Sequence, residues 1–183
     1  DYRRGRYKPL AANVSLQYAN REPRFYASVG YNGSVWEYLG DPENTHHNRQ
    51  TFYYRGSGNG YNNSQFYLRT GISVKKYVNP TDVPDREDYK NIKDKAEPAI
   101  RYADILLLYA EALNELDGTY TIPSWDEATT YNISRDIVEI QKGIHPIRIR
   151  GGVPDYSTDV YANKDLLRAK IKRERMIEFM GEG

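Results

Sequence analysis

The 183-residue chain changes its sequence pattern near Pro98, and this change limits the folds that it can adopt. Before Pro98, Tyr, Asn, Gly and Ser are frequent and few periodicities persist. After it, apolar residues recur three and four positions apart, as they do on one face of a helix. The charged, proline-containing segment 79–98 is typical of a connecting loop. We therefore expect a loop-rich, Tyr- and Asn-rich segment with short strands at 1–95 and a helical part at 96–183.

Three segments of the first part have the composition of short strands. Residues 24–30 and 66–70 are dense in aromatic and β-branched side chains, and residues 72–78 alternate apolar with polar side chains. These patterns predict a small β element joined by long loops.

The first helix is predicted directly after Pro98. Because Ile105, Leu106 and Leu108 extend its apolar surface, we expect this helix to be buried on most sides. Small alanines along it would let a neighbouring helix approach closely, and Gly118 would end it. Its expected core stripe is Ile100, Ala103, Leu107, Ala110 and Leu113 or Asn114.

A second helix is predicted to begin at Ser124, because Glu127 stands three residues later, as in a capping box. Gly143 and Pro146 should bend or break it before a short continuation that ends at residues 151–152. Its expected core stripe is Ile133, Ile137, Ile140 and Ile144.

A third helix is predicted to begin near Asn163, a favourable N-cap residue. Three antiparallel helices with short links form helical hairpins, although no 34-residue tetratricopeptide repeat can be aligned. The predicted fold class is therefore mainly α, with tetratricopeptide-like helical hairpins, a loop-rich segment and short β-strands.

Composition excludes several classes of function. Lys and Arg total 26 against 25 Asp and Glu, so the chain lacks the cationic excess of a nucleic-acid surface. The absence of Cys removes disulfides, thiolate metal ligands and thiol nucleophiles. No apolar run approaches the roughly 20 residues that a membrane span requires, and no signal segment opens the chain.

Catalytic and metal sites are not expected. His46 and His47 are adjacent and His145 lies beside a proline, so no spacing typical of a zinc site is present. Glu174 and Glu178, one helical turn apart, fit either a catalytic carboxylate pair or ion pairs with arginines that fix helix packing. We favour the ion pairs, and we predict no catalytic residue, no metal and no cofactor.

The best candidate for ligand contact is segment 52–67, in which aromatic side chains alternate with amides and a guanidinium. A sugar ring has apolar C–H faces and a polar hydroxyl rim, so it stacks on Tyr or Trp and is oriented by polar groups. Alternatively, Tyr53, Tyr67 and Trp36 would seal the loops against the helical body. The candidate ligand-binding residues are Tyr31, Asn32, Trp36, Tyr53, Tyr54, Arg55, Tyr61 and Asn62.

Four ordered blocks cover nearly the whole chain and resemble the C-terminal region of SusD/RagB-like lipoproteins. Gly151 replaces the usual Ala of the third block, and His145 with Pro146 replaces Ile-Asn before it. The blocks are residues 18–36, Arg101-Tyr-Ala-Asp-Ile-Leu-Leu-Leu-Tyr-Ala-Glu-Ala112, Ile147-Arg-Ile-Arg-Gly-Gly-Val-Pro154 and Glu174-Arg-Met-Ile-Glu-Phe-Met-Gly-Glu-Gly183.

This resemblance implies a non-catalytic surface protein of Bacteroidota that captures glycans, or less often peptides. It would deliver them to a partner SusC-like TonB-dependent transporter at the extracellular face of the outer membrane. The family's N-terminal helical units and the lipidated Cys that anchors it to the membrane are expected to lie outside this chain. A tetratricopeptide-like interaction scaffold and a glycan-active enzyme remain alternative classes.

Overall fold

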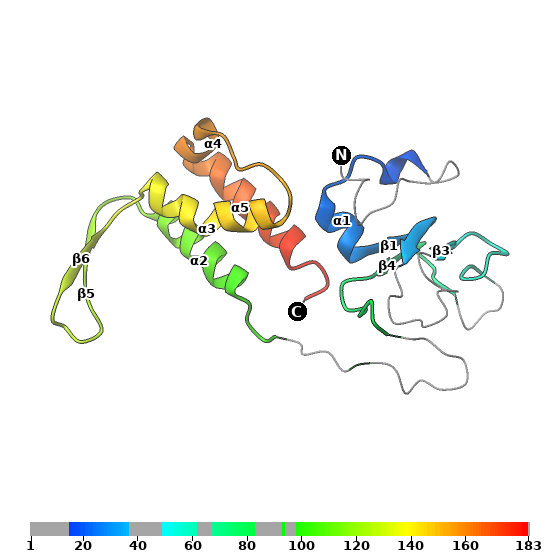
Figure 1. The fold of residues 1–183 in the computed structure, drawn as a ribbon. Coiled ribbons are helices and arrows are strands. Elements are labelled where there is room, and N and C mark those ends of the chain that lie inside the picture. The colour runs from blue at the N-terminus through cyan, green and yellow to red at the C-terminus, as the bar shows by residue number, and fades with distance from the viewer. Residues whose placement is uncertain (1–14, 37–48, 62–66, 83–92, 94–97, 183) are drawn as a thin grey trace. The chain divides into compact units, whose positions relative to one another are not determined.

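The computed structural model describes residues 15–36, 49–61, 67–82, 93 and 98–182 (Figure 1). The chain forms two compact units, Asp1–Glu97 and Pro98–Gly183. Each unit has its own buried cluster of apolar side chains.

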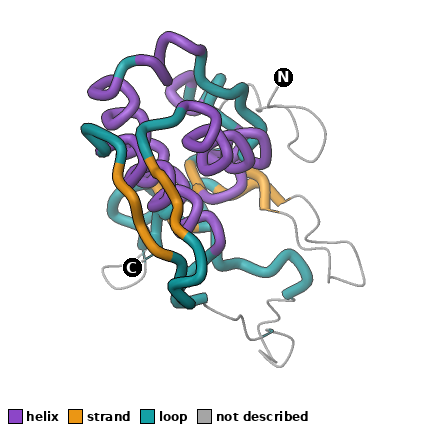
Figure 2. The backbone as a smooth tube through the Cα atoms, turned by 90° about the vertical axis from the view of Figure 1, so that its left-hand side faces the viewer, coloured by secondary structure: helices purple, strands orange, loops and turns teal. Residues whose placement is uncertain are grey.

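Helices build the second unit. Helix α2 packs against both α3 and α5, and the short α4 packs on α5. Figure 2 shows these helices together, with the two strands of the β5–β6 hairpin side by side. This arrangement confirms the mainly α class. The elements are α2 (Tyr102–Glu115), β5 (Tyr120–Pro123), β6 (Thr130–Ile133), α3 (Ile137–Arg150), α4 (Thr158–Ala162) and α5 (Lys164–Glu178).

The predicted stripe of α2 is largely correct, because Ala103, Leu107, Ala110, Leu113 and Asn114 are buried. The expectation that α2 is buried on most sides is wrong. Ile105 and Leu108 are 51% and 48% exposed, because α3 and α5 cover only one face of the helix. Ile100, predicted as the first residue of the stripe, lies before α2 and is 67% exposed, so its predicted burial is wrong. Helix α2 also ends at Glu115, before the predicted stop at Gly118.

The predicted capping box at Ser124 and Glu127 is also wrong. These residues lie in the turn of an antiparallel hairpin, in which β5 pairs with β6 (Figure 1). The Ser124 hydroxyl donates to Asp126 Oδ1 at 2.5 Å and accepts from the Thr129 N–H at 3.0 Å, so it stabilises a turn. Helix α3 begins later, after Asp136, whose carboxylate accepts from two backbone N–H groups.

Helix α3 continues through Gly143 and Pro146, so the predicted break does not occur. Pro146 is exposed, and at Gly143 the backbone of α2 lies close against α3. A Cβ added at Gly143 would stand 2.4 Å from the carbonyl oxygen of Leu106. The predicted end of this helix is correct, since a turn with Gly152 at φ 72° follows Arg150.

The predicted start of the third helix is confirmed. Asn163 precedes α5, and its side-chain oxygen accepts from the Leu166 N–H at 3.0 Å. The apolar face of α5 buries Leu167 and Ile171 against the other helices.

Short elements make up the described part of the first unit. The predicted strand at 24–30 is mostly wrong, because Pro23 begins helix α1 and only the last residues enter a strand. No strand forms at 67–70, and Phe66 lies outside the described residues. The elements are η1 (Leu16–Tyr18), α1 (Pro23–Ser28), β1 (Val29–Tyr31), β2 (Ser34–Trp36), β3 (Arg49–Thr51) and β4 (Ile72–Val74).

Two antiparallel strand pairs organise these elements. Strand β1 pairs with β4, and β2 pairs with β3. The predicted strand at 72–78 is therefore confirmed only for its first three residues, after which a turn follows.

Candidate ligand-binding surface

Tyr31 belongs to the apolar core of the first unit. Its side chain is 5% exposed, and its ring lies 4.6 Å from the ring of Tyr18 and 5.5 Å from that of Phe25. Burial, aided by the nearby Tyr26, raises the pKa of Tyr31 to about 12. This candidate residue therefore presents almost no surface to a ligand.

Asn32 and Tyr53 hold two chain segments together. The Asn32 side-chain oxygen accepts from the Tyr53 N–H at 2.8 Å, and the Tyr53 hydroxyl lies 3.1 Å from Ser73 Oγ. The ring of Trp36 lies beside them, because a Cβ at Gly30 would come within 2.6 Å of Trp36 Cζ2 and 3.3 Å of the Tyr53 hydroxyl. These candidates thus pack around Gly30 and support the loop that follows β3.

That loop, residues 52–61, is closed by its own hydrogen bonds. The buried Ser57 hydroxyl lies 2.7 Å from the Phe52 carbonyl oxygen and 2.6 Å from that of Tyr54. A Cβ at Gly60 would stand 1.8 Å from the Tyr54 carbonyl oxygen, so only glycine fits there. The loop is therefore a defined turn, and its outward side chains are presented from a hydrogen-bonded base.

Tyr54, Arg55 and Tyr61 face outward from this loop. Tyr54 is 59% exposed and Tyr61 is 43% exposed. Arg55 Cζ lies 6.0 Å from the centre of the Tyr61 ring. The structure thus brings these three candidates together at the surface, whereas Asn62 lies outside the described residues.

Two further side chains continue this surface. The Tyr67 ring meets that of Tyr61 edge-on, with centres 4.9 Å apart, and Arg69 Cζ lies 5.8 Å from the Tyr67 ring. We call Arg55, Tyr61, Tyr67 and Arg69 the Arg–Tyr row. Arg69 was missed from the sequence, although its position two residues after an aromatic in a turn-rich segment could have indicated it.

The carboxylates of α5 form the ion pairs expected from the sequence. Glu174 and Glu178 are 1% and 4% exposed. Arg148 donates to Glu174 at 2.7 Å, and Arg101 and Arg150 both donate to Glu178, the first at 2.9 Å. These contacts join α5 to α3 and to the start of α2.

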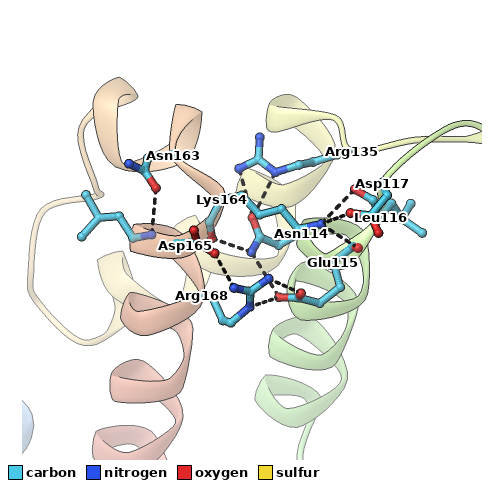
Figure 3. A network of polar contacts seen from close by, with 10 residues as sticks. Asn114, Glu115, Leu116, Asp117, Arg135, Asn163, Lys164, Asp165 and Arg168 are labelled. Atoms are coloured by element: carbon cyan, nitrogen blue, oxygen red, sulfur yellow. Dashed lines mark hydrogen bonds and ion pairs between the residues drawn. The ribbon is translucent and has the colours of Figure 1, made fainter.

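A second polar network closes the other end of the helices (Figure 3). Asn114 is fully buried, accepts from Arg135 at 3.0 and 3.1 Å, and donates to the Lys164 carbonyl at 3.0 Å. Arg168 binds both carboxylate oxygens of Glu115 and thereby holds the pKa of Glu115 below its usual value. The network fixes the base of the β5–β6 hairpin between α2 and α5.

The described residues offer no cluster of His, Asp and Glu side chains that could hold a metal ion. His145 Nδ1 instead lies 2.9 Å from Asp155 Oδ2, while His46 and His47 lie outside the described residues. Among the helices described, none has the length and apolar character needed to cross a membrane.

Comparison with known proteins assigns the family. The sequence model of the SusD family matches residues 4–183. The chain belongs to the SusD family. The resemblance seen in the four sequence blocks is thus confirmed.

A crystal structure of a SusD-like protein from Bacteroides fragilis shares the fold. It is 25% identical to this chain, with a TM-score of 0.56 over 92% of the chain. The chain spans 28% of the length of that SusD-like protein. No curated protein matches the sequence. The mainly α, SusD-like fold class is therefore confirmed.

Proposed function

We propose that this SusD family chain is part of a non-catalytic surface protein that captures glycans as nutrients. The captured oligosaccharides would pass to a SusC-like TonB-dependent transporter at the extracellular face of the outer membrane, where a lipid anchor outside this chain holds the protein. The observation that carries this proposal is the SusD family match over residues 4–183.

The surface that we propose for glycan contact is formed by Tyr54, Arg55 and Tyr61. Exposed Tyr rings offer flat apolar faces for sugar C–H groups, and their hydroxyls together with the guanidinium offer hydrogen bonds to the polar rim. Asn32 and Tyr53 support this surface from below through their hydrogen bond, and Trp36 packs beside them. Tyr31 contributes to the core beneath and makes no direct contact with the ligand.

A binding role is also supported by the burial and ion pairing of Glu174 and Glu178. Glycoside hydrolysis needs one carboxyl group that can protonate and a second that can attack or activate water. Glu174 and Glu178 are only 1% and 4% exposed, and each is bound by guanidinium groups that join α5 to neighbouring segments. A substrate has almost no access to carboxylates in such a position, so this pair is suited to packing helices.

The test uses Tyr54→Ala and Tyr61→Ala in the full-length protein, with Tyr131→Ala as the control. Tyr131 lies on β6 of the second unit and is 56% exposed, which matches the exposure of Tyr54. Oligosaccharide affinity and co-purification with the transporter are measured separately. We expect affinity to fall by about fivefold in the first two variants, because each loses a stacking face worth on the order of 1 kcal/mol.

Transporter co-purification should be the same in all three variants. Loss of transporter association with unchanged glycan affinity would show that the site is misplaced. Binding of peptides but of no glycan would favour a peptide-capturing member of the family. Release of new reducing ends from a bound glycan would show an enzyme.

A further inference from the structure

The sequence around the Arg–Tyr row has an unbalanced charge. Residues 44–81 contain five basic residues and no Asp or Glu, although the whole chain has 26 basic and 25 acidic residues. The basic residues of this acid-free stretch are Arg49, Arg55, Arg69, Lys75 and Lys76. A surface built from such a stretch attracts anions over several ångströms, up to the screening length of the solution.

The contacts distinguish the two arginines of the row from Lys75. Lys75 donates to the Val35 carbonyl at 3.0 Å and lies over the ring of Trp36, so it is occupied within the unit. Arg55 and Arg69 are exposed, and within the described residues their contacts are with the rings of Tyr61 and Tyr67.

A guanidinium placed near an aromatic ring keeps its N–H groups available at its edge. In the second unit the pattern is different, since Arg101, Arg148 and Arg168 each bind a carboxylate of the protein. Among the described residues, Arg55 and Arg69 pair with no carboxylate. Each therefore retains the donors that could bind a carboxylate or sulfate of a ligand in a bidentate manner.

The two guanidiniums are linked through the rings of Tyr61 and Tyr67. Each one contacts a tyrosine, and the two tyrosine rings meet with centres 4.9 Å apart. A ligand that contacts the two rings thus meets one positive charge beside each ring. A neutral sugar would gain the stacking contact but would leave both charges without a counter-charge.

We propose that the Arg–Tyr row selects acidic glycans, whose sugar rings contact Tyr61 and Tyr67 while their anionic groups bind Arg55 and Arg69. This inference rests on the proposed function and adds the class of glycan to it. The anionic group is a uronate carboxylate or a sulfate ester, since both accept two parallel N–H bonds from one guanidinium.

The experiment measures binding of three probes to the full-length protein by calorimetry. An oligogalacturonide supplies carboxylates, a sulfated galactan oligosaccharide supplies sulfates without carboxylates, and the carboxyl-reduced oligogalacturonide supplies the same sugar chain without charge. We expect at least one acidic probe to bind more than tenfold more tightly than the neutral one, and its affinity to fall as salt is raised. The acidic probe that binds identifies the anionic group.

The double variant Arg55→Gln with Arg69→Gln removes both charges of the row. Its control, Lys172→Gln with Arg173→Gln, removes two exposed charges of α5 in the second unit. We expect the first double variant to lose about tenfold or more in affinity for the acidic probe, because hydrogen bonds to charged groups are the strong ones. The control should change this affinity by less than about twofold at moderate salt.

The outcomes separate this inference from the proposed function. Binding of the neutral probe as tightly as the acidic ones, or an unchanged affinity in the Arg55 and Arg69 double variant, overturns the selection of acidic glycans and leaves glycan capture standing. Binding of an acidic peptide but of no glycan overturns both proposals, as does the absence of binding to any glycan probe or to a panel of neutral oligosaccharides.

Discussion

The close approach of α2 and α3 at Gly143 makes a sharp prediction about stability. A Cβ at this position would stand 2.4 Å from the Leu106 carbonyl oxygen, 2.9 Å from Ala110 Cβ and 3.3 Å from the Ala110 nitrogen. Two of these atoms are backbone atoms of a helix, so no side-chain rotation can relieve the clash. The substitution Gly143→Ala therefore forces the two helices apart.

Two effects of opposite sign decide the magnitude. Alanine in place of glycine inside a helix favours folding by about 1 kcal/mol. Overpacking of a filled core costs about 1–3 kcal/mol, and the backbone position of the clash places Gly143 at the upper end of this range. Fully buried Leu107 and Ile144 would lose contact as the helices separate. We expect a net loss of about 1–2 kcal/mol in the free energy of unfolding.

The assay is urea denaturation of the full chain, followed by circular dichroism at a wavelength that reports helix. Gly118→Ala is the matched control, because a Cβ at Gly118 meets no atom within 4 Å. This control should be neutral or stabilised by up to about 1 kcal/mol. A Gly143→Ala variant as stable as the parent chain, or more stable, would refute the close helix approach described above.

Three further predictions concern buried and exposed side chains. Glu174→Gln should lower the free energy of unfolding by about 3 kcal/mol, because it leaves the largely buried Arg148 without its counter-charge. The control Asp165→Asn changes an 87% exposed carboxylate and should cost less than about 1 kcal/mol in the same urea titration. The pKa of Tyr31 is raised to about 12, so its hydroxyl stays protonated in the folded state at a pH above ~10, where the unfolded chain releases that proton. The free energy of unfolding should therefore fall as the pH rises from about 10 to 12. Tyr31→Phe should lessen this fall, measured as the difference in unfolding free energy between pH 9 and 11, and an equally steep fall would contradict the assignment of Tyr31 to the core. Trp125→Ala should change stability by no more than about 0.5 kcal/mol, because the side chain is 96% exposed; a loss above 1 kcal/mol would show that it packs against the protein.

The sequence predicted those features of the second unit that depend on residues within a single helix. The N-cap at Asn163 and the buried stripe of α2 depend on residues three or four positions apart, which the sequence displays directly. The Ser124 and Glu127 spacing also fitted a helix start, but the Thr- and Tyr-rich segments on either side favour strands, and their pairing determined the structure. Which face of α2 is covered depends on where α3 and α5 lie, and no pattern within α2 carries that information.

At the candidate surface, too, contacts between distant segments decide which side chains are exposed. Tyr53 and Tyr54 are neighbours with the same side chain, yet Tyr53 contacts Ser73, twenty residues away, while Tyr54 faces outward. Composition could indicate that segment 52–67 is rich in aromatics, but Ser73 and Tyr53 meet only through the pairing of β1 with β4 and of β2 with β3. The unbalanced charge of residues 44–81, in contrast, is fully visible in the sequence.

The two tryptophans of the chain lie in different units and in different surroundings. Trp36 is half-buried beneath Lys75, whereas Trp125 stands in the turn of the β5–β6 hairpin, 96% exposed. The fluorescence of Trp125 should therefore be quenched readily by acrylamide and change little when the helices unfold. A change in the emission spectrum would then report the first unit, while circular dichroism reports the helices of the second, so the two signals together can tell whether the units unfold as one.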